Sequence, residues 1–314
     1  MPPETLTQSG ARVVDPVLTE VAQGFRHPDR IGEIIFPRVT VTASGGQIIQ
    51  FGKESFRKRD YSRAPGANAK QVDFGYQGDK YALVNKSADA KVPREWQRDA
   101  SRVPGIDLGS RAVEVTMRAL ELELEIEQAE LALDATQYAA ANKVTLSGTD
   151  QWSDTSGSDP ITQIDDYRDT VAGRVGIRPN VLELGRKAWR LLKNHPKVTD
   201  RFKHTTSAAL TEELIAALLQ LDRIVVGRAV YADDNDNFQD VWDPNTGLLT
   251  YSNLAPLGRE EPSYGYSYTM DGHPLVVVPE WNRDARSWMY GMDYERAPVI
   301  ASADSGFLIQ SIGA

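Results

Sequence analysis

The sequence predicts an α+β fold, in which helices and strands occur in runs rather than in strict alternation. Two observations indicate this class, and the length bounds the number of domains. Apolar residues recur in steps of three and four over residues 107–142, which is the period of a helix. Several short strand-like runs follow one another after residue 220, with turn-forming residues between them. The length of 314 residues suits two compact domains or one large elaborated domain.

The N-terminal residues 1–44 show no helical period, so we expect an extended arm there. Short strand-like pieces lie within it at residues 34–36 and 39–41. The pair Gly45-Gly46 then predicts a turn into a strand at residues 48–51.

Residues 51–80 combine aromatic and basic side chains around a turn signal at residues 64–68, which predicts a long two-stranded hairpin. A hairpin alone is marginally stable in water, so another surface must cover it. Single-stranded nucleic acid is one candidate cover, through base stacking and phosphate contacts. A neighbouring subunit is the other, and the acidic balance of the chain favours it, because the basic side chains would meet acidic surface such as the long helix. The candidate interface residues are Phe51, Phe56, Arg57, Lys58, Arg59, Tyr61 and Arg63.

The segment 107–142 gives the clearest helix, with Asp107 as its expected N-cap. Its two apolar stripes form a face wide enough to pack on a sheet, and the helix would extend for about 50 Å. Six glutamates lie between the stripes. They allow an acid–base pair, but we interpret them as a solvated face that Arg111 and Arg118 partly compensate.

A second region follows the polar linker 147–159. Asp159-Pro160 predicts a capped helix that runs to about Gly173. A strand is expected at residues 181–184 and a short helix at 187–193. Another helix should begin at Thr211, where Leu210 and Ile215 are placed to form a hydrophobic staple. The remaining strand candidates are residues 224–229, 248–253, 264–269, 275–278, 299–301 and 307–312.

Composition and motifs exclude many kinds of site. The chain has no cysteine, which rules out disulfides, thiolate metal sites and a cysteine nucleophile. Its formal net charge of −9 argues against a dedicated nucleic-acid binder. No nucleotide-binding, zinc-protease or serine-hydrolase motif is present, and no two of the four histidines have the spacing of metal ligands on a helix. Residues 233–244 resemble the start of a calcium loop, but Phe238 and Pro244 replace the required Gly and Glu. We therefore predict no catalytic, metal-binding or cofactor-binding residues, and no enzyme.

The N-terminus lacks the features of a signal peptide, and the apolar run 275–278 is far too short to span a membrane. We expect a soluble protein that stays in the compartment where it is made. Ordering an extended arm and a long hairpin costs about 1–2 kcal/mol per residue. Such segments persist only when partner surfaces cover them, so we expect a closed homo-oligomer.

The order of these elements resembles the major capsid proteins of tailed bacteriophages, with the fold named after phage Hong Kong ninety-seven. The most specific stretch begins with the capped helix at Asp159-Pro160, continues through the G-x-x-P-N turn at residues 176–180 and ends in His195-Pro196. Residues 63–67 resemble the tip of that family's E-loop hairpin, and residues 297–309 are similar to its closing strands. The individual motifs are short, and their order along nearly the whole chain is what is specific.

The resemblance implies a division of the chain. Residues 1–44 would be the N-terminal arm and residues 45–88 the E-loop. Residues 89–160 and 256–314 would form the peripheral domain (P-domain), with its spine helix at about 107–142. Residues 161–255 would form the axial domain (A-domain).

The implied function is that of a coat protein. Copies would assemble through pentamers and hexamers into an icosahedral shell around the double-stranded DNA genome, with DNA contacted only non-specifically. The protein would be part of the virion capsid, assembled in the host cytoplasm, with portal and decoration proteins as further partners and no membrane. No helical scaffolding segment precedes the arm, so we expect any scaffold to be a separate protein. No Lys–Asn cross-linking pair of the namesake can be matched, so we expect non-covalent locking.

Two alternatives remain at this point. An encapsulin shell has the same fold but encloses enzyme cargo. A soluble carbohydrate- or nucleotide-processing enzyme with an unrecognised site is the other.

Overall fold

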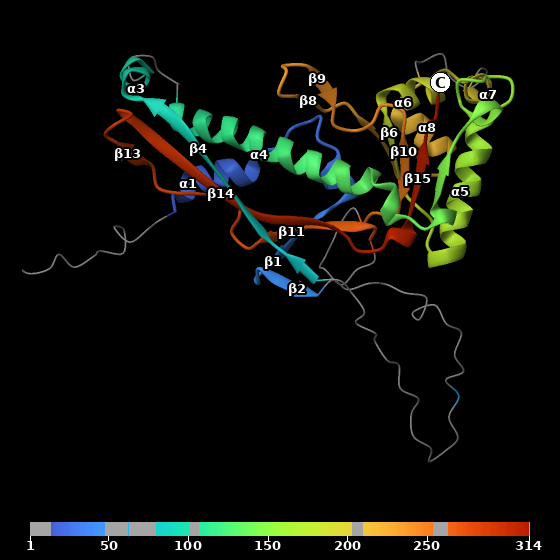
Figure 1. Cartoon of the computed structure of the whole chain (residues 1–314), viewed down its shortest axis with the longest axis horizontal. Helices are drawn as coiled ribbons and strands as arrows, with labels where there is room; N and C mark the ends of the chain where they lie inside the picture. Colours follow the sequence, from blue (N-terminus) through green and yellow to red (C-terminus); the bar gives the residue numbers. More distant parts are fainter. Residues whose placement is uncertain are drawn as a thin grey trace, which may run out of the picture.

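The computed structural model describes residues 14–47, 62, 80–100, 107–202, 210–253 and 263–313. Two sheets lie toward opposite ends of an elongated molecule, and one long helix extends between them (Figure 1). The helices are α1 (Pro16–Gly24), α2 (Gly32–Ile35), α3 (Arg94–Ala100), α4 (Leu108–Leu133), α5 (Pro160–Val175), α6 (Arg186–Asn194), α7 (Pro196–Phe202) and α8 (Glu212–Leu218). The strands are β1 (Arg38–Val41), β2 (Gly45–Gln47), β3 (Lys80–Ala82), β4 (Val84–Pro93), β5 (Lys143–Thr145), β6 (Val181–Gly185), β7 (Arg223–Gly227), β8 (Val230–Ala232), β9 (Phe238–Asp240), β10 (Gly247–Thr250), β11 (Gly265–Met270), β12 (Leu275–Val276), β13 (Glu280–Asn282), β14 (Ser287–Ile300) and β15 (Gly306–Gln310). The α+β class is therefore confirmed.

The larger sheet has six strands and is organised around β14. Strand β4 pairs antiparallel with β14 over ten residues, from Val84 opposite Arg296 to Pro93 opposite Ser287. On its other side β14 pairs in succession with β11, β12 and β13, and β1 adds to β11 in parallel. Helix α4 packs on both β4 and β14. One of the two apolar stripes, which includes Val113, Met117 and Leu124, thus covers the sheet, whereas Val115 of the other stripe is exposed.

The smaller sheet has five strands in the order β5-β15-β10-β6-β7. Helices α5 to α8 lie around it at one end of the molecule (Figure 1). Their apolar residues and those of β6, β10 and β15 form one hydrophobic cluster, which includes Leu182, Leu192, Ile215 and Leu249. Strand β15 belongs to this sheet, whereas the resemblance implies that residues 256–314 belong to the P-domain. The strand returns here because its partner β10 lies at the centre of the smaller sheet.

The long helix ends nine residues earlier than predicted, at Leu133 rather than 142. Asp134 stops it because its carboxylate accepts hydrogen bonds from the amide and hydroxyl of Thr136 at 2.9 and 2.7 Å. The chain then turns through short 3-10 helices into β5. These local hydrogen bonds compete with continuation of the helix, and the apolar pattern alone does not reveal them.

The prediction of a wholly extended N-terminal arm is wrong, because α1 and α2 lie within it. Asp15 caps α1 by accepting hydrogen bonds from the amides of Val17 and Leu18, and Pro16 begins the helix. The expected strand at residues 34–36 is instead the end of α2, whereas the strand at residues 39–41 is confirmed as β1. Nine residues with two buried apolar positions give too weak a period for the sequence to reveal α1.

The hairpin is described only at its base. Strands β2 and β3 pair antiparallel, with Gly45 opposite Ala82 and Gln47 opposite Lys80. The predicted strand at 48–51, the turn at 64–68 and the hairpin tip lie outside the described residues.

Several local predictions are confirmed. Asp159 caps α5 and Pro160 begins it, and the helix ends at Gly176 in a left-handed conformation. Strand β6, helix α6 and the Thr211 cap of α8 lie where expected, and Leu210 and Ile215 belong to the same cluster. Two long strands were missed. The sequence does not predict β4, and it predicts only the end of β14. Within the described ranges, no helix is both long and apolar enough to cross a membrane.

Candidate functional site at the junction of the N-terminal segment, the long helix and the sheets

The glutamates of α4 do not form the solvated face that the sequence predicts. Glu121 and Glu125 are 7% and 2% exposed, and Glu123 and Glu127 are half-buried. The exposed members are Glu114 and Glu130. Burial of so many carboxylates is costly unless each finds a partner, and the partners come from three other parts of the chain.

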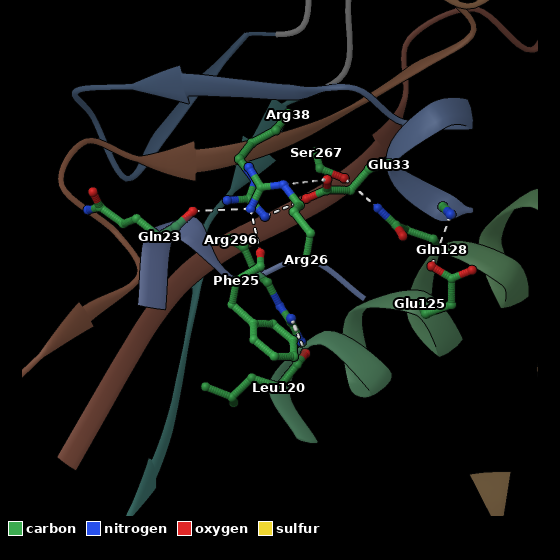
Figure 2. A network of polar contacts seen from close by, with 11 residues as sticks. Gln23, Phe25, Arg26, Glu33, Arg38, Leu120, Glu125, Gln128, Ser267 and Arg296 are labelled. Atoms are coloured by element: carbon green, nitrogen blue, oxygen red, sulfur yellow. Dashed lines mark hydrogen bonds and ion pairs between the residues drawn. The ribbon is translucent and has the colours of Figure 1, made fainter. Parts of the chain in front are cut away.

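Glu125 joins α4 to the N-terminal segment and to the loop after β9. Its carboxylate accepts hydrogen bonds from the amides of Ile31 and Gly32 at 3.0 and 2.9 Å, and from Nε1 of Trp242 at 2.7 Å. Gln128, one turn further along, donates to Ser267 of β11 at 2.8 Å (Figure 2). The first turn of α2 is therefore fastened to the long helix through its free amides. Burial raises the pKa of Glu125 in spite of these donors.

Arg296 fastens β14 to the same helix. Its side chain is fully buried, and it donates to the carbonyl oxygen of Leu120 at 2.6 Å. It also pairs with Glu123 and Glu127 at 3.3 and 3.5 Å. Lys86 of β4 pairs with the same two carboxylates at 2.7 and 2.9 Å. The guanidinium lies 5.1 Å from the ring centroid of Tyr294.

The pKa values of the two bases are shifted in opposite directions. Burial lowers the pKa of Arg296, while hydrogen bonds to Glu123 and Glu127 raise the pKa of Lys86.

A second charged group lies where the N-terminal segment crosses the helix. Glu33 pairs with Arg38, and with Arg26 at 3.7 Å. Glu121 lines a small cavity of about 60 Å³ beside Arg26, Arg30 and Glu33. Burial and the repulsion of Glu33 raise the pKa of Glu121 to about 7, against the opposing effect of the arginines. The acidic row of α4 is thus largely balanced within the subunit.

The other residues that the sequence singled out have structural roles. Nε2 of the buried His195 lies 3.1 Å from the Ser158 hydroxyl, and Nδ1 accepts from the amide of Lys197 at 3.3 Å. The Ser158 hydroxyl lies 2.7 Å from the carbonyl oxygen of Asp154, to which it donates, so it is not poised as a nucleophile. Asp233 accepts from the amides of Asn235 and Asn237 and shapes the turn between β8 and β9. In the part of the chain that the structure describes, no group of three acidic or histidine side chains has the arrangement of a metal site.

The predicted interface residues Phe51, Phe56, Arg57, Lys58, Arg59, Tyr61 and Arg63 all lie outside the described residues. The structure does reveal an apolar surface that the sequence missed. An open groove of about 890 Å³ runs between β4, α3 and the first half of α4. Trp96 and Val115 on it are 64% and 58% exposed, and α3 has no buried residue. The sequence signals for this surface are a tryptophan in a short polar segment and the apolar residues Ala112, Val115 and Ala119 of α4.

The arrangement therefore fastens elements together and leaves an apolar groove open, which is typical of a subunit that is completed by association.

Comparison with known proteins identifies the kind of subunit. The family model described as phage major capsid protein E matches residues 134–286. The major capsid protein of Burkholderia phage BcepMu is 33% identical over 308 residues, covering 97% of this chain and 98% of the relative.

Solved structures agree with this match. A phage-related protein from Bordetella bronchiseptica is 44% identical, with a TM-score of 0.84, and the match covers 96% of this chain and 98% of that one. A putative prophage capsid protein from Escherichia coli shares the fold at 13% identity, with a TM-score of 0.56 and 94% and 96% coverage. The 33% identity to a phage capsid protein over 97% of the chain favours the phage alternative over the encapsulin alternative. The chain belongs to the major capsid proteins of phages, which are structural proteins with the Hong Kong ninety-seven type of fold.

Proposed function

We propose that this capsid protein assembles through pentamers and hexamers into an icosahedral shell that encloses the double-stranded DNA genome of a phage. The observation that carries the proposal is the similarity to a phage major capsid protein over 97% of the chain. The protein is then a component of the virion, assembled in the host cytoplasm. In this proposal the protein has no catalytic residues, and its function is structural.

The fold suggests which part does what. The six-stranded sheet with α4 serves as the P-domain, and the five-stranded sheet with α5 to α8 serves as the A-domain, whose tip gathers around the symmetry axes. Strand β15 is assigned to the A-domain here because it pairs with β10.

The excursion between Gln47 and Lys80 serves as the E-loop and lies over an adjacent subunit. The pairing of β2 with β3 supports this, because it holds the two ends of the excursion side by side. The aromatic residues Phe51, Phe56 and Tyr61 require an apolar cover, and the groove beside Trp96 supplies one on the neighbour. The acidic row of α4 is a poor acceptor for the basic residues of the excursion, because Lys86 and Arg296 already neutralise much of it.

The remaining partners follow from the same proposal. A separate scaffolding protein, decoration proteins and a portal act with the shell. DNA makes only non-specific contacts with the shell. The net charge of −9 would make the inner wall of the shell acidic, so that it repels DNA while the genome is packaged. Strong, salt-sensitive binding of duplex DNA by the free subunit would contradict that role.

Negative-stain electron microscopy with sedimentation velocity on the same sample tests the assembly. Closed shells, or rings of five and six subunits, are expected. A species that stays a monomer or dimer, even with its scaffold supplied, would refute the shell. Deletion of residues 52–79 should give a folded subunit that does not assemble, and normal shells from this variant would refute the E-loop assignment. Enzyme cargo that co-purifies with shells would indicate an encapsulin.

A further inference from the structure

Glu183 occupies an unusual position for an acidic residue. It lies in the middle of β6, is 0% exposed and has Leu248 and Val225 as its cross-strand neighbours. Both of its carboxyl oxygens are buried without a hydrogen-bond partner among the described residues. A buried polar group in this condition calls for a specific explanation, because leaving it unpaired is expensive.

Glu183 lies in the hydrophobic core between the smaller sheet, the end of α4 and the N-terminal segment. Its strand neighbours Val181, Val225 and Leu248 belong to a cluster that also contains Phe36 beside α2 and Ala132 near the end of α4. Trp242 and Tyr138 belong to the same cluster. Water that entered beside Glu183 would therefore loosen the N-terminal segment, the long helix and the smaller sheet from one another.

The ionisable groups around Glu183 all oppose its negative charge. Glu125 of α4 and Asp243 of the loop after β9 raise its pKa further, although burial has the largest effect. Tyr138 is the other titratable group whose charge is coupled to Glu183.

Different surroundings push the pKa values of two nearby carboxyl groups apart. Glu125 accepts three hydrogen bonds from N–H donors, and these stabilise its anion. The indole N–H of Trp242 is one of the three, so it is turned toward Glu125. Glu183 has no such donor. The three donors favour the ionised form of Glu125, whereas the unpaired oxygens of Glu183 favour its neutral form.

We propose that Glu183 is a proton-controlled latch between the smaller sheet, the long helix and the N-terminal segment: as a neutral acid it permits the closely packed junction seen here, and its ionisation opens the junction to water. The latch belongs to the folded subunit and does not depend on how the subunits assemble. It makes the rigidity of the junction a function of pH, so that the N-terminal segment, the long helix and the smaller sheet are free to shift relative to one another when the proton is lost.

The direction of the effect follows from linkage. The pKa of Glu183 in the folded chain is well above its ordinary value of 4.5. The stabilisation of the closed junction is therefore fully present below pH 4.5, and it is lost as the pH rises toward the folded-state pKa. A single group that ionises on opening changes the opening equilibrium by at most about tenfold per pH unit in that window.

Hydrogen–deuterium exchange of the full-length protein at a series of pH values tests the latch. Residues 28–36 and 238–248 report the junction, and Glu183→Gln keeps the shape of the side chain without its charge. Above pH 4.5, the opening constant of the wild type relative to Glu183→Gln should grow by up to about tenfold per pH unit. Glu114→Gln, on the exposed face of α4, should follow the wild type at every pH.

A second variant and a spectroscopic measurement complete the test. Glu183→Met removes the charge with an apolar side chain, so it replaces the glutamine variant if that variant does not fold, and it should also flatten the pH dependence. Infrared spectroscopy at neutral pH should show a protonated-carboxyl band in the wild type that weakens in either variant. A ratio of opening constants that stays the same at every pH, or an infrared band of unchanged strength, would overturn the proposal.

Discussion

Nε1 of Trp242 donates a hydrogen bond of 2.7 Å to Oε1 of Glu125, and both side chains are buried. The tryptophan follows the β8–β9 hairpin, and the glutamate lies on the long helix. This one contact therefore connects the part of the chain around the smaller sheet to the helix that supports the larger one. The close packing of Trp242 also depends on Gly227, because a Cβ there would lie 2.4 Å from the Cβ of Trp242.

Truncation of Glu125 should be strongly destabilising. Glu125→Ala leaves the indole N–H of Trp242 and the amides of Ile31 and Gly32 buried without an acceptor. We expect a loss of about 3–5 kcal/mol in the free energy of unfolding, measured by denaturant titration. The exposed control Glu114→Ala should change it by less than about 0.5 kcal/mol. Equal effects of the two substitutions would show that the junction does not depend on Glu125.

The buried guanidinium of Arg296 makes the second prediction. Arg296→Ala leaves the carbonyl oxygen of Leu120 unpaired and removes a cation from between Glu123 and Glu127. Lys86 remains as the partner of both glutamates, so we expect a loss of about 3 kcal/mol rather than more. Arg118→Ala on the exposed side of the same helix is the control. Thermal unfolding of both variants measures the difference, and an Arg296→Ala variant as stable as Arg118→Ala would contradict the role.

The buried environment of His195 predicts that the protein becomes less stable in acid. Burial is the largest cause that lowers the pKa of His195, and Lys197 adds to it. The folded state therefore favours the neutral ring, so this stabilisation is present above the ordinary pKa of 6.5 and is lost as the pH falls from 6.5 through the folded-state value. The melting temperature of the wild type should fall more between pH 7 and pH 5 than that of His195→Asn. The partly exposed His27 provides the control His27→Asn, which should melt in parallel with the wild type.

Replacement of glycine by alanine should change the free energy of unfolding in opposite directions at two positions. A Cβ at Gly185 would lie 2.1 Å from the backbone oxygen of Asp243, so Gly185→Ala should destabilise by at least about 1–3 kcal/mol. Gly173 lies within α5, where a Cβ would meet nothing within 4 Å. Gly173→Ala should stabilise by about 0.5–1 kcal/mol, because glycine costs entropy inside a helix. Chemical denaturation of the pair checks the packing of the smaller sheet, and two shifts of the same sign would contradict it.

Sequence patterns predicted the elements whose signals are local. The caps at Asp107, Asp159 and Thr211 are each read from a few adjacent residues, and all three are confirmed. The end of α4 was not predictable in this way, because it depends on the side chain of Asp134 turning back on Thr136. The strand β4 was missed because its exposed and half-buried residues give a polar run.

The candidate site was missed for a different reason. Six glutamates at helical spacing are typical of a solvated face, and their burial depends on partners distant in sequence, such as Lys86 and Arg296. The amides that Glu125 binds, at Ile31 and Gly32, are backbone groups and leave no trace in a side-chain pattern. Long-range pairing of this kind follows from the fold, so it becomes visible only once the fold is known.

The groove makes the last prediction, which separates folding from assembly. Trp96 is 64% exposed on α3, so Trp96→Ala should leave the melting temperature of the isolated subunit unchanged. If a neighbouring copy covers the groove, the same change removes a buried aromatic contact from every interface, at about 2 kcal/mol or more each. The protein concentration needed for shell formation should then rise, as measured by light scattering and electron microscopy. Phe238→Ala, which removes an exposed aromatic ring from the β8–β9 hairpin, is the control and should assemble as the wild type does. Shells of Trp96→Ala that form at the wild-type concentration would show that the groove stays open in the assembled particle.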